Sequence, residues 1–268
     1  MPDRFVEIEV ENYIATLSLA NNKNLNALTV DFAAEITESV KALDAREDVR
    51  VIILKSNARI FCAGLDLKGL MSLELLGCGA KTAYYFQDKL QALFDCCNIM
   101  EICRKPIIAA VHGMCIGGGL DMISACDIRL CTEDASFCLK EAAIGMVADM
   151  GVLQRLPHII GQGFTREMAY TARLYSSREA ERMGLVTAVY PDQETLLAEA
   201  KTLAGQICEN GPLGVMATKE VLNYSRTASI EEGMHMGIQK NAVLMSSKDI
   251  PEAVKAFLEK RKPNFKGE

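Results

Sequence analysis

The middle of the chain reads IIAAVHGMCIGGGLDMISACDIRLCTEDASFCLKEAAIG (residues 107–145). It begins with a β-rich apolar run directly after Pro106, and a glycine-rich turn then leads into an apolar helical segment. A further segment, from Asp127 to Leu139, has the pattern of two short strands. Strand, turn, helix and paired strands in this order predict the core of an α/β protein.

The preceding residues continue this alternation. Residues 5–11 and 13–19 alternate apolar and polar side chains around a turn-prone Glu11-Asn12, which predicts a β-hairpin. Apolar residues recur at helical spacing from Thr29 to about Ala45, with Thr29 as the expected N-cap. Residues 49–56 form a β-rich apolar run, and this predicts another strand.

Helices dominate the rest of the chain. Residues 67–104 are helical in pattern with a break at Gly77-Cys78-Gly79, and we interpret residues 69–85 as a variable loop or lid. Beyond residue 150, the only strand pattern is at 185–191. The expected helices there are 162–173, 176–184, 193–210, 212–225, 229–247 and 249–260. The pattern therefore predicts an α/β core followed by a helical tail.

Composition excludes several classes of protein. The chain has 268 residues, of which 50% are hydrophobic and 24% charged, as in an ordinary globular protein of one or two domains. The net charge of −6 argues against a nucleic-acid-binding protein. No apolar run is long enough to span a membrane. The ten cysteines lie mainly in apolar contexts without metal-ligand spacing, which indicates free thiols and no metal site.

Two glycine turns are the first candidates for a functional site. FCAGLDL (residues 61–67) and IGGGLD (residues 116–121) each follow a predicted strand, so backbone amides can be left free there and a ligand can approach closely. Two such amides converging on one carbonyl oxygen would form an oxyanion hole. Met122 stands where a dinucleotide-binding fingerprint requires glycine or alanine, which argues against a nicotinamide or flavin cofactor.

Three acidic residues complete the candidate site. Asp121 directly follows the glycine triplet, and Glu141 lies in a mostly apolar neighbourhood. Asp149 is an isolated charge in MVADMGVL, where burial would be costly. A helix N-cap accounts for Asp149 equally well, because GVLQRL can begin a helix.

Residues 107–145, together with FCAGLDL upstream, resemble the crotonase (enoyl-CoA hydratase/isomerase) superfamily. The similarity extends to NLNAL (residues 24–28), LPHIIG (156–161) and the closing AFLEKRKPNF. The resemblance implies a spiral of ββα turns over residues 1–205 that carries the active site. It also implies a helical C-terminal region, residues 206–268, that assembles a homotrimer or a hexamer made of two trimers.

The resemblance also implies a substrate joined to coenzyme A through a thioester, with no separate cofactor and no metal. The oxyanion hole would consist of the amides of Leu65 and Gly118. The residues implied in coenzyme A binding are Lys23, Cys62, Ala63, Asp66 and Leu67. The basic tail within residues 255–268 is either a second phosphate contact or a solvated helix end.

The acids indicate which family reaction to expect. Hydratases of this family carry glutamates at the positions of Asp121 and Glu141, and typically glycine at position 149. An acid at 149 with aspartate at 121 is similar to the family members that convert 3,5-dienoyl-CoA to 2,4-dienoyl-CoA in unsaturated fatty-acid β-oxidation. That reaction moves a proton between carbons 2 and 6, which are too far apart for one carboxylate. The expected roles are base for Glu141, acid for Asp149 in an apolar pocket, and an orienting role for Asp121.

Two other functions remain open. One is an enoyl-CoA hydratase that uses Asp121 and Glu141, and the other is a non-catalytic acyl-CoA-binding or RNA-binding relative. The amino terminus carries no clear targeting signal. Fatty-acid oxidation implies a mitochondrial or peroxisome-like compartment in a eukaryote, and the cytoplasm otherwise.

Overall fold

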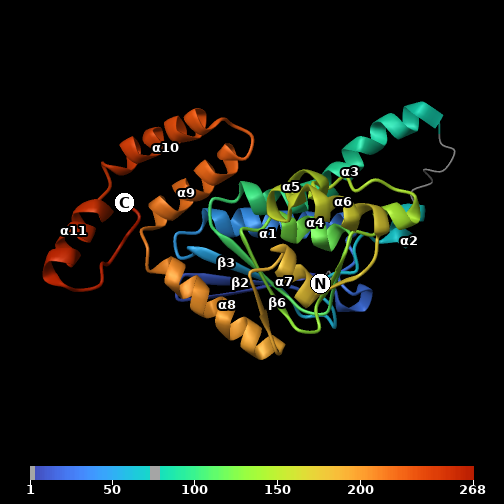
Figure 1. Cartoon of the computed structure of the whole chain (residues 1–268), viewed down its shortest axis with the longest axis horizontal. Coiled ribbons are helices and arrows are strands. Elements are labelled where there is room, and N and C mark those ends of the chain that lie inside the picture. The colour runs from blue at the N-terminus through green and yellow to red at the C-terminus, as the bar shows by residue number, and fades with distance from the viewer. Residues whose placement is uncertain (1–3, 73–78) are drawn as a thin grey trace.

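A six-stranded sheet forms the centre of the molecule (Figure 1). The computed structural model describes residues 4–72 and 79–268. Strands β1 (Val6–Glu11) and β2 (Ile14–Leu19) pair antiparallel, which confirms the predicted hairpin. The other strands of this sheet run parallel to β2 in the order β3 (Val51–Ser56), β4 (Ile107–Val111), β6 (Ile128–Thr132) and β9 (Ala188–Tyr190).

A second, smaller sheet contains β5 (Met114–Ile116), β7 (Ser136–Cys138) and β8 (Tyr175–Ser176). The chain passes from the large sheet to the small one twice, from β4 to β5 and from β6 to β7. The two strands predicted within residues 127–139 therefore belong to different sheets. Gly113, with φ +57°, makes the turn between β4 and β5 in a conformation that favours glycine.

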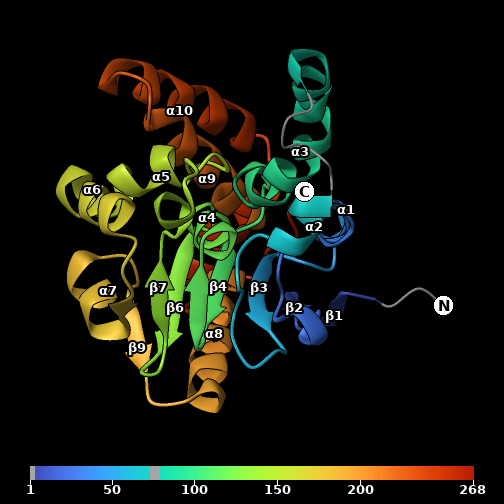
Figure 2. The same ribbon diagram turned by 90° about the vertical axis from the view of Figure 1, so that its right-hand side faces the viewer.

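Helices cover one side of these sheets. Helix α1 (Val30–Ala45) begins as predicted, because the Thr29 side chain accepts a hydrogen bond from the Phe32 amide at 3.2 Å. It packs against α3 (Gly79–Ile102), which in turn packs against α4 (Gly118–Ser124) (Figure 2). The remaining elements of the core are η1 (Asn22–Asn24), α2 (Leu67–Ser72), η2 (Glu141–Ile144), α5 (Val152–Ile159), α6 (Gly161–Thr171) and α7 (Ser177–Met183).

Most of the expected break and part of the expected lid, residues 73–78, lie outside the described residues. Besides the short helical turns η1 and η2, the sequence pattern missed α5, β5 and β8. Strands β5 and β8 have only three and two residues, so they carry almost no alternation pattern. Helix α5 contains Pro157, and proline inside a short segment argues against a helix when only the sequence is known.

Helix α8 (Gln193–Cys208) covers the other face of the large sheet. Its buried Leu196, Ala200 and Ala204 pack against Val51 and Ile108 of the central strands. The small alanines allow the helix backbone to approach the sheet closely. The helix continues past residue 205, so the domain boundary expected there falls inside an element that packs on the core.

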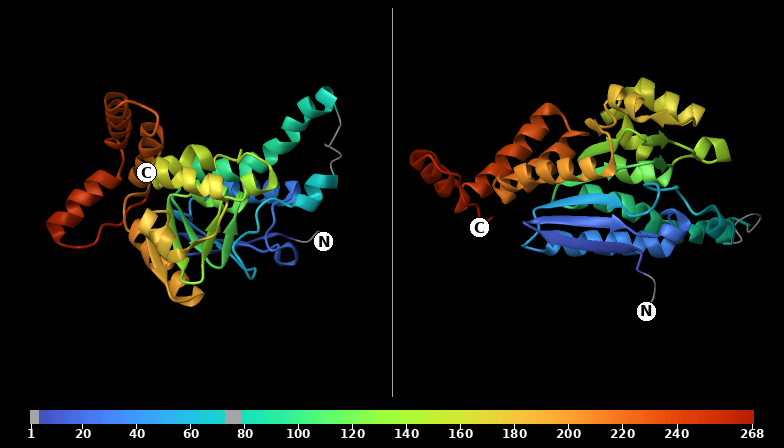
Figure 3. Two further views of the ribbon diagram at one scale, coloured as in Figure 1. Left: turned by 45° about the vertical axis from the view of Figure 1, so that its right-hand side comes forward. Right: turned by 90° about the horizontal axis from the view of Figure 1, so that it is seen from below.

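Three helices extend away from the core at the C-terminal end: α9 (Pro212–Ser225), α10 (Ile230–Leu244) and α11 (Asp249–Glu259) (Figures 1 and 3). The buried Lys219 ammonium attaches α9 to the core through Asp127 at 2.8 Å and the Met100 carbonyl at 2.9 Å. The α/β core followed by a helical tail is as predicted. None of the helices in the described ranges is long and apolar enough to cross a membrane.

Candidate active site

The two glycine turns lie side by side. The Cys62 amide donates to the Met114 carbonyl at 3.1 Å, and the Cys62 carbonyl accepts from the Ile116 amide at 3.0 Å. Gly64, with φ +90°, follows, and a β-carbon there would lie 3.0 Å from the Ile116 carbonyl oxygen. The close approach and the positive φ both require glycine at this position. The structure thus brings together the two motifs that the sequence places about fifty residues apart.

The main-chain amides of Leu65 and Gly118 can each donate a hydrogen bond to a ligand oxygen. Leu28 pairs with both neighbours of Leu65, donating to the Gly64 carbonyl at 2.7 Å and accepting from the Asp66 amide at 3.0 Å. In a paired segment the polar groups alternate in direction, so the Leu65 amide points away from Leu28. Gly118 is the first residue of α4, so its amide has no carbonyl one turn earlier in the helix.

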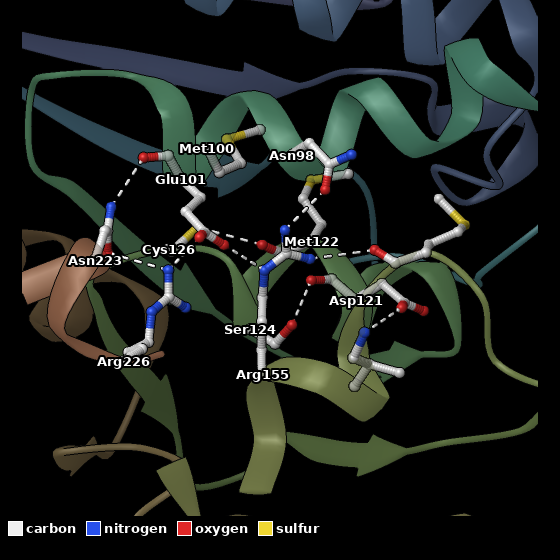
Figure 4. Close-up of polar contacts among 12 residues, drawn as sticks. Asn98, Met100, Glu101, Asp121, Met122, Ser124, Cys126, Arg155, Asn223 and Arg226 are labelled. Carbon is white, nitrogen blue, oxygen red and sulfur yellow. Dashed lines mark hydrogen bonds and ion pairs between the residues drawn. The ribbon is translucent and has the colours of Figure 1, made fainter. Parts of the chain in front are cut away.

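Asp121 is buried in α4 and holds the beginning of α5. One carboxylate oxygen accepts a hydrogen bond from the Val152 amide at 2.9 Å (Figure 4). Burial raises the pKa of Asp121 to about 7, and the nearby charges of Glu141 and Asp149 add to the effect. The three predicted acids are therefore close enough to interact electrostatically.

Glu141 lies beside the second glycine turn, at the start of η2. A β-carbon on Gly117 would lie 2.9 Å from Glu141 Oε1, so glycine leaves room for this carboxylate. Glu141 Oε2 is buried and has no hydrogen-bond partner within residues 4–72 and 79–268. Burial raises the pKa of Glu141, and the charge of Asp149 raises it further. A carboxylate with a raised pKa and an unused oxygen can act as a general base.

Asp149 is exposed between the buried residues Ala148 and Met150. Partial burial raises its pKa. Asp149 is not the N-cap of α5: Gly151 has that position, and Asp121 binds the first helical amide. The structure therefore excludes the N-cap interpretation that the sequence left open.

The surroundings of Asp149 differ from the sequence-based expectation. Asp149 lines a hollow of about 560 Å³ whose other residues include Asn98, Gln154, Asn223 and Arg226. The prediction of an apolar pocket around Asp149 is therefore wrong for the described residues. Glu141 instead lines a neighbouring hollow of about 350 Å³ with apolar residues such as Met146. The two acids thus face two adjacent spaces, one polar and one mainly apolar.

The residues expected to bind coenzyme A surround the first glycine turn. Lys23 is exposed in η1, and Leu67 is exposed at the start of α2, whereas Ala63 and Asp66 are half-buried. The Cys62 side chain is fully buried, and its thiol donates to the Asn26 carbonyl at 3.0 Å. Only the main chain of Cys62 can therefore line a ligand site.

In the basic tail, carboxylates neutralise two of the cations. Arg261 pairs with Glu252 at 2.6 Å and with Glu259 at 2.7 Å, and Lys262 pairs with Glu209 at 2.6 Å. These pairs favour the interpretation of the tail as a solvated helix end.

One buried cation lies near the acids, and no sequence motif pointed to it. Arg155, in α5, is 8% exposed and interacts with Glu101 and Asn98 of α3 (Figure 4). A single arginine within the apolar segment VLQRLP was the available signal, because an isolated charge among apolar residues requires partners when it is buried.

Comparisons with known proteins show which family this chain belongs to. The sequence profile of the enoyl-CoA hydratase/isomerase family matches residues 9–268. The chain belongs to this family. It is 42% identical to the peroxisomal Delta(3,5)-Delta(2,4)-dienoyl-CoA isomerase of Arabidopsis thaliana, over 90% of this chain and 88% of the relative. It is 39% identical to the mitochondrial Delta(3,5)-Delta(2,4)-dienoyl-CoA isomerase of Dictyostelium discoideum, over 95% of this chain and 88% of the relative.

Solved structures show the same fold. An enoyl-CoA hydratase from Bacillus anthracis superposes with a TM-score of 0.90 and 30% identity, covering 99% of this chain and all of that one. The crotonase fold and an enzymatic function, both expected from the motifs, are thereby confirmed.

Proposed function

We propose that this enzyme converts 3,5-dienoyl-CoA to 2,4-dienoyl-CoA. The observation that carries the proposal is the position of Asp149 beside the second glycine turn. Asp121 binds the Val152 amide at 2.9 Å, three residues after Asp149, and a β-carbon on Gly118 would lie 3.6 Å from the sulfur of Met150, the residue after Asp149. The carboxyl groups thus gather beside the two glycine turns. The 42% and 39% identity to relatives named dienoyl-CoA isomerases, against 34% and 32% to relatives named hydratases, supports the same reaction.

In the proposed mechanism, the thioester oxygen accepts hydrogen bonds from the Leu65 and Gly118 amides. Loss of a proton from C2 generates a trienolate, in which the negative charge extends from the thioester oxygen to C6. These donors stabilise the charge by about 3 kcal/mol each. Both amides belong to segments fixed by glycine and by main-chain hydrogen bonds, so little reorganisation is needed when the charge develops.

Glu141 takes the proton from C2, and its unpartnered oxygen and raised pKa suit this role. The electron pair moves through the conjugated chain to C6, where Asp149 delivers its proton. The raised pKa of Asp149 favours the protonated form that this step requires. Solvent then removes the proton from Glu141 and restores one to Asp149, so the enzyme is unchanged after each turnover.

The environment of Asp121 argues against the hydratase alternative. A hydratase would need Asp121 and Glu141 to hold and activate a water molecule. Asp121 is 1% exposed and already accepts the Val152 amide, so its carboxyl has an orienting role between α4 and α5. Its aspartate side chain is also one methylene shorter than glutamate.

Absorbance distinguishes the two reactions directly. Isomerisation of a 3,5-dienoyl-CoA places two double bonds in conjugation with the carbonyl and increases long-wavelength absorption, whereas hydration of a 2-enoyl-CoA decreases absorption. We expect a rapid increase with the first substrate and little change with the second. A decrease with the second substrate and no change with the first would establish the hydratase instead.

Coenzyme A binding is proposed at Lys23, the Cys62 and Ala63 main chain, Asp66 and Leu67, with no separate cofactor. The accessible part of this set lies along the first glycine turn, which carries the Leu65 amide. Replacing Lys23 with alanine should increase KM for acyl-CoA several-fold with little change in kcat. An unchanged KM would remove Lys23 from the proposal.

A homotrimer or a dimer of trimers is proposed for the assembled enzyme. Large apolar side chains are exposed along α10 and α11, including Ile230 at 85% and Phe257 at 82%. Exposed apolar surface of this extent is typical of protein interfaces. Sedimentation equilibrium should give the mass of three or six chains, and a monomer at micromolar concentration would contradict the proposal.

A mitochondrial or peroxisomal location is proposed if the protein comes from a eukaryote, because relatives with those locations in their names match most of the chain. Fractionation of cells that express the full protein should place it with organelle markers. Recovery in the cytosolic fraction would contradict this part of the proposal.

The net charge of −6 argues against RNA binding, and retention of the protein on RNA at moderate salt would revive that alternative.

A further inference from the structure

The short turn that carries Asp149 is held by side chains from other elements. The Arg155 guanidinium donates through Nη1 to the Met150 carbonyl at 3.2 Å, directly after Asp149. A β-carbon on Gly151 would lie 2.0 Å from the same nitrogen, and Gly151 has φ +106°. The guanidinium therefore occupies the space that any larger residue at 151 would need. Asp121 fixes the far end of the turn through the Val152 amide.

The guanidinium is itself held from the opposite side. Its Nε donates to Glu101 Oε2 at 2.6 Å, and its Nη2 donates to Asn98 Oδ1 at 2.8 Å (Figure 4). With the Met150 carbonyl, three acceptors thus engage three different nitrogens of one rigid, planar group. The guanidinium can satisfy all of them in only one orientation, so the position of the turn is tied to α3.

The network extends to α9. Arg226 forms an ion pair with Glu101 Oε1, and Asn223 donates to the Glu101 carbonyl at 3.1 Å. Burial alone would raise the pKa of Glu101, but hydrogen bonding and the charges of Arg155 and Arg226 lower it overall. Glu101 is therefore the charged link between the C-terminal helices and the turn.

The Asp149 carboxylate has no comparable support. Within the described parts of the chain, it forms no side-chain hydrogen bond to another residue, and its neighbours Ala148 and Met150 are buried. Its position thus depends on the main chain of the turn. We propose that Arg155, oriented by Glu101 and Asn98, is a positioning residue that places Asp149 for proton delivery at C6. This inference rests on the proposed isomerase function.

Replacement of Arg155 should affect the proton transfers at C2 and at C6 differently. If Arg155 positions only Asp149, replacement of Arg155 does not affect the removal of the C2 proton by Glu141. Glu141 exchanges the proton it has taken with D₂O and reprotonates the trienolate at C2 instead of C6, so deuterium appears at C2 of unreacted substrate. A displacement of the acid by 1 Å is enough to slow the C6 step by roughly 10²-fold.

The test measures both reactions with a 3,5-dienoyl-CoA in D₂O, for Arg155→Lys and Glu101→Gln. We expect isomerisation to fall roughly 10-fold to 10²-fold, while deuterium incorporation at C2 changes less than about 3-fold. Glu101→Gln keeps the size of the side chain, and it decides the question if Arg155→Lys does not fold. Arg129→Lys is the matched control, since Arg129 is also a buried arginine bound to carbonyls, at Leu185 and Cys126. It should leave the ratio of the two reactions unchanged.

A double-mutant cycle sharpens the test. Adding Asp149→Asn to Arg155→Lys should slow isomerisation no further than Asp149→Asn alone, because both changes act on one step. Equal losses of both reactions in Arg155→Lys and Glu101→Gln, or independent effects in the double mutant, would overturn the positioning role. If the unaltered protein does not isomerise the substrate, the proposed function itself fails, and this inference fails with it.

Discussion

The two halves of the candidate site are held in place by different means. The half that would bind the thioester oxygen is fixed by the main chain: Cys62 bonds to Met114 and Ile116, and Gly64 lies against Ile116. The turn that carries Asp149 is fixed by the side chains of Asp121 and Arg155. A geometry built from main-chain bonds is insensitive to most side-chain substitutions. One built from side chains can be altered by a single substitution, so the choice of reaction can vary while the thioester site stays constant.

The largest effect is expected from substitution of Asp149, which belongs to the half that is fixed by side chains. Asp149→Asn removes the acid at C6, and general acid catalysis contributes about 10²-fold to 10⁴-fold, so isomerisation should fall by that factor. Deuterium exchange at C2 should continue, because the thioester half and Glu141 are unaltered. Asp31→Asn, at an exposed aspartate of α1, is the matched control. Isomerisation within a few-fold of the unaltered rate in Asp149→Asn would contradict the assignment.

The side-chain half should also carry an electrostatic cost that depends on pH. The folded protein holds the Asp121 proton with a pKa of about 7, against 3.8 for the ordinary side chain, so folding favours the protonated form. The contribution of Asp121 to the free energy of unfolding is therefore fully present below pH 3.8. It decreases by about 4 kcal/mol as the pH rises toward 7. Asp121→Asn does not titrate, and its side-chain oxygen can still accept the Val152 amide.

Urea unfolding of both proteins from pH 4.5 to pH 8 measures this difference. The stability of Asp121→Asn relative to the unaltered protein should increase up to about pH 7 and level off above it. If the free energies of unfolding of the two proteins differed by the same amount at every pH, Asp121 would not be the source of the pH-dependent loss of stability.

A change in the main-chain half should affect both reactions together. Gly64→Ala introduces a β-carbon 3.0 Å from the Ile116 carbonyl at a φ of +90°, so the segment and the adjacent Leu65 amide must shift. Loss of one oxyanion donor costs about 10²-fold to 10³-fold, and a displaced donor should cost roughly 10²-fold or less in both isomerisation and C2 exchange. Gly161→Ala is the matched control, because Gly161 has φ +76° and open space around it. A loss confined to isomerisation would contradict the division between the halves.

The smallest expected effect is at the outer end of the network. Arg226→Gln breaks the ion pair with Glu101 but leaves the Arg155–Glu101 pair at 2.6 Å in place. The ratio of isomerisation to C2 exchange should decrease by about 3-fold or less, since the turn keeps its direct support. A decrease as large as that of Arg155→Lys would show that α9 controls the turn more directly than the geometry indicates.

Local sequence signals predicted the elements that local interactions determine. The Thr29 cap, the hairpin and the strand before each glycine turn follow from neighbouring residues, and they are correct. The convergence of the two glycine turns was also predictable, because parallel strands end at the same edge of a sheet. The roles proposed for Glu141 and Asp149 come from the family resemblance, because no local pattern contains them.

The support of the Asp149 turn could not be predicted in this way. Asp121 meets Val152 across 31 residues, and Arg155 meets Asn98 across 57. Such contacts depend on how α3, α4 and α5 pack, and the sequence pattern of α5 was itself obscured by Pro157. The sequence analysis therefore left the N-cap role of Asp149 open and missed Arg155.

The most direct test of the two-acid mechanism is the position of deuterium in the product formed from a 3,5-dienoyl-CoA in D₂O, determined by NMR. The mechanism predicts that the unaltered enzyme produces 2,4-dienoyl-CoA with deuterium at C6, and that Asp149→Asn yields substrate labelled at C2 with almost no product. Product labelled at C6 at an undiminished rate in Asp149→Asn would contradict it, as would an unaltered enzyme that forms no 2,4-dienoyl-CoA.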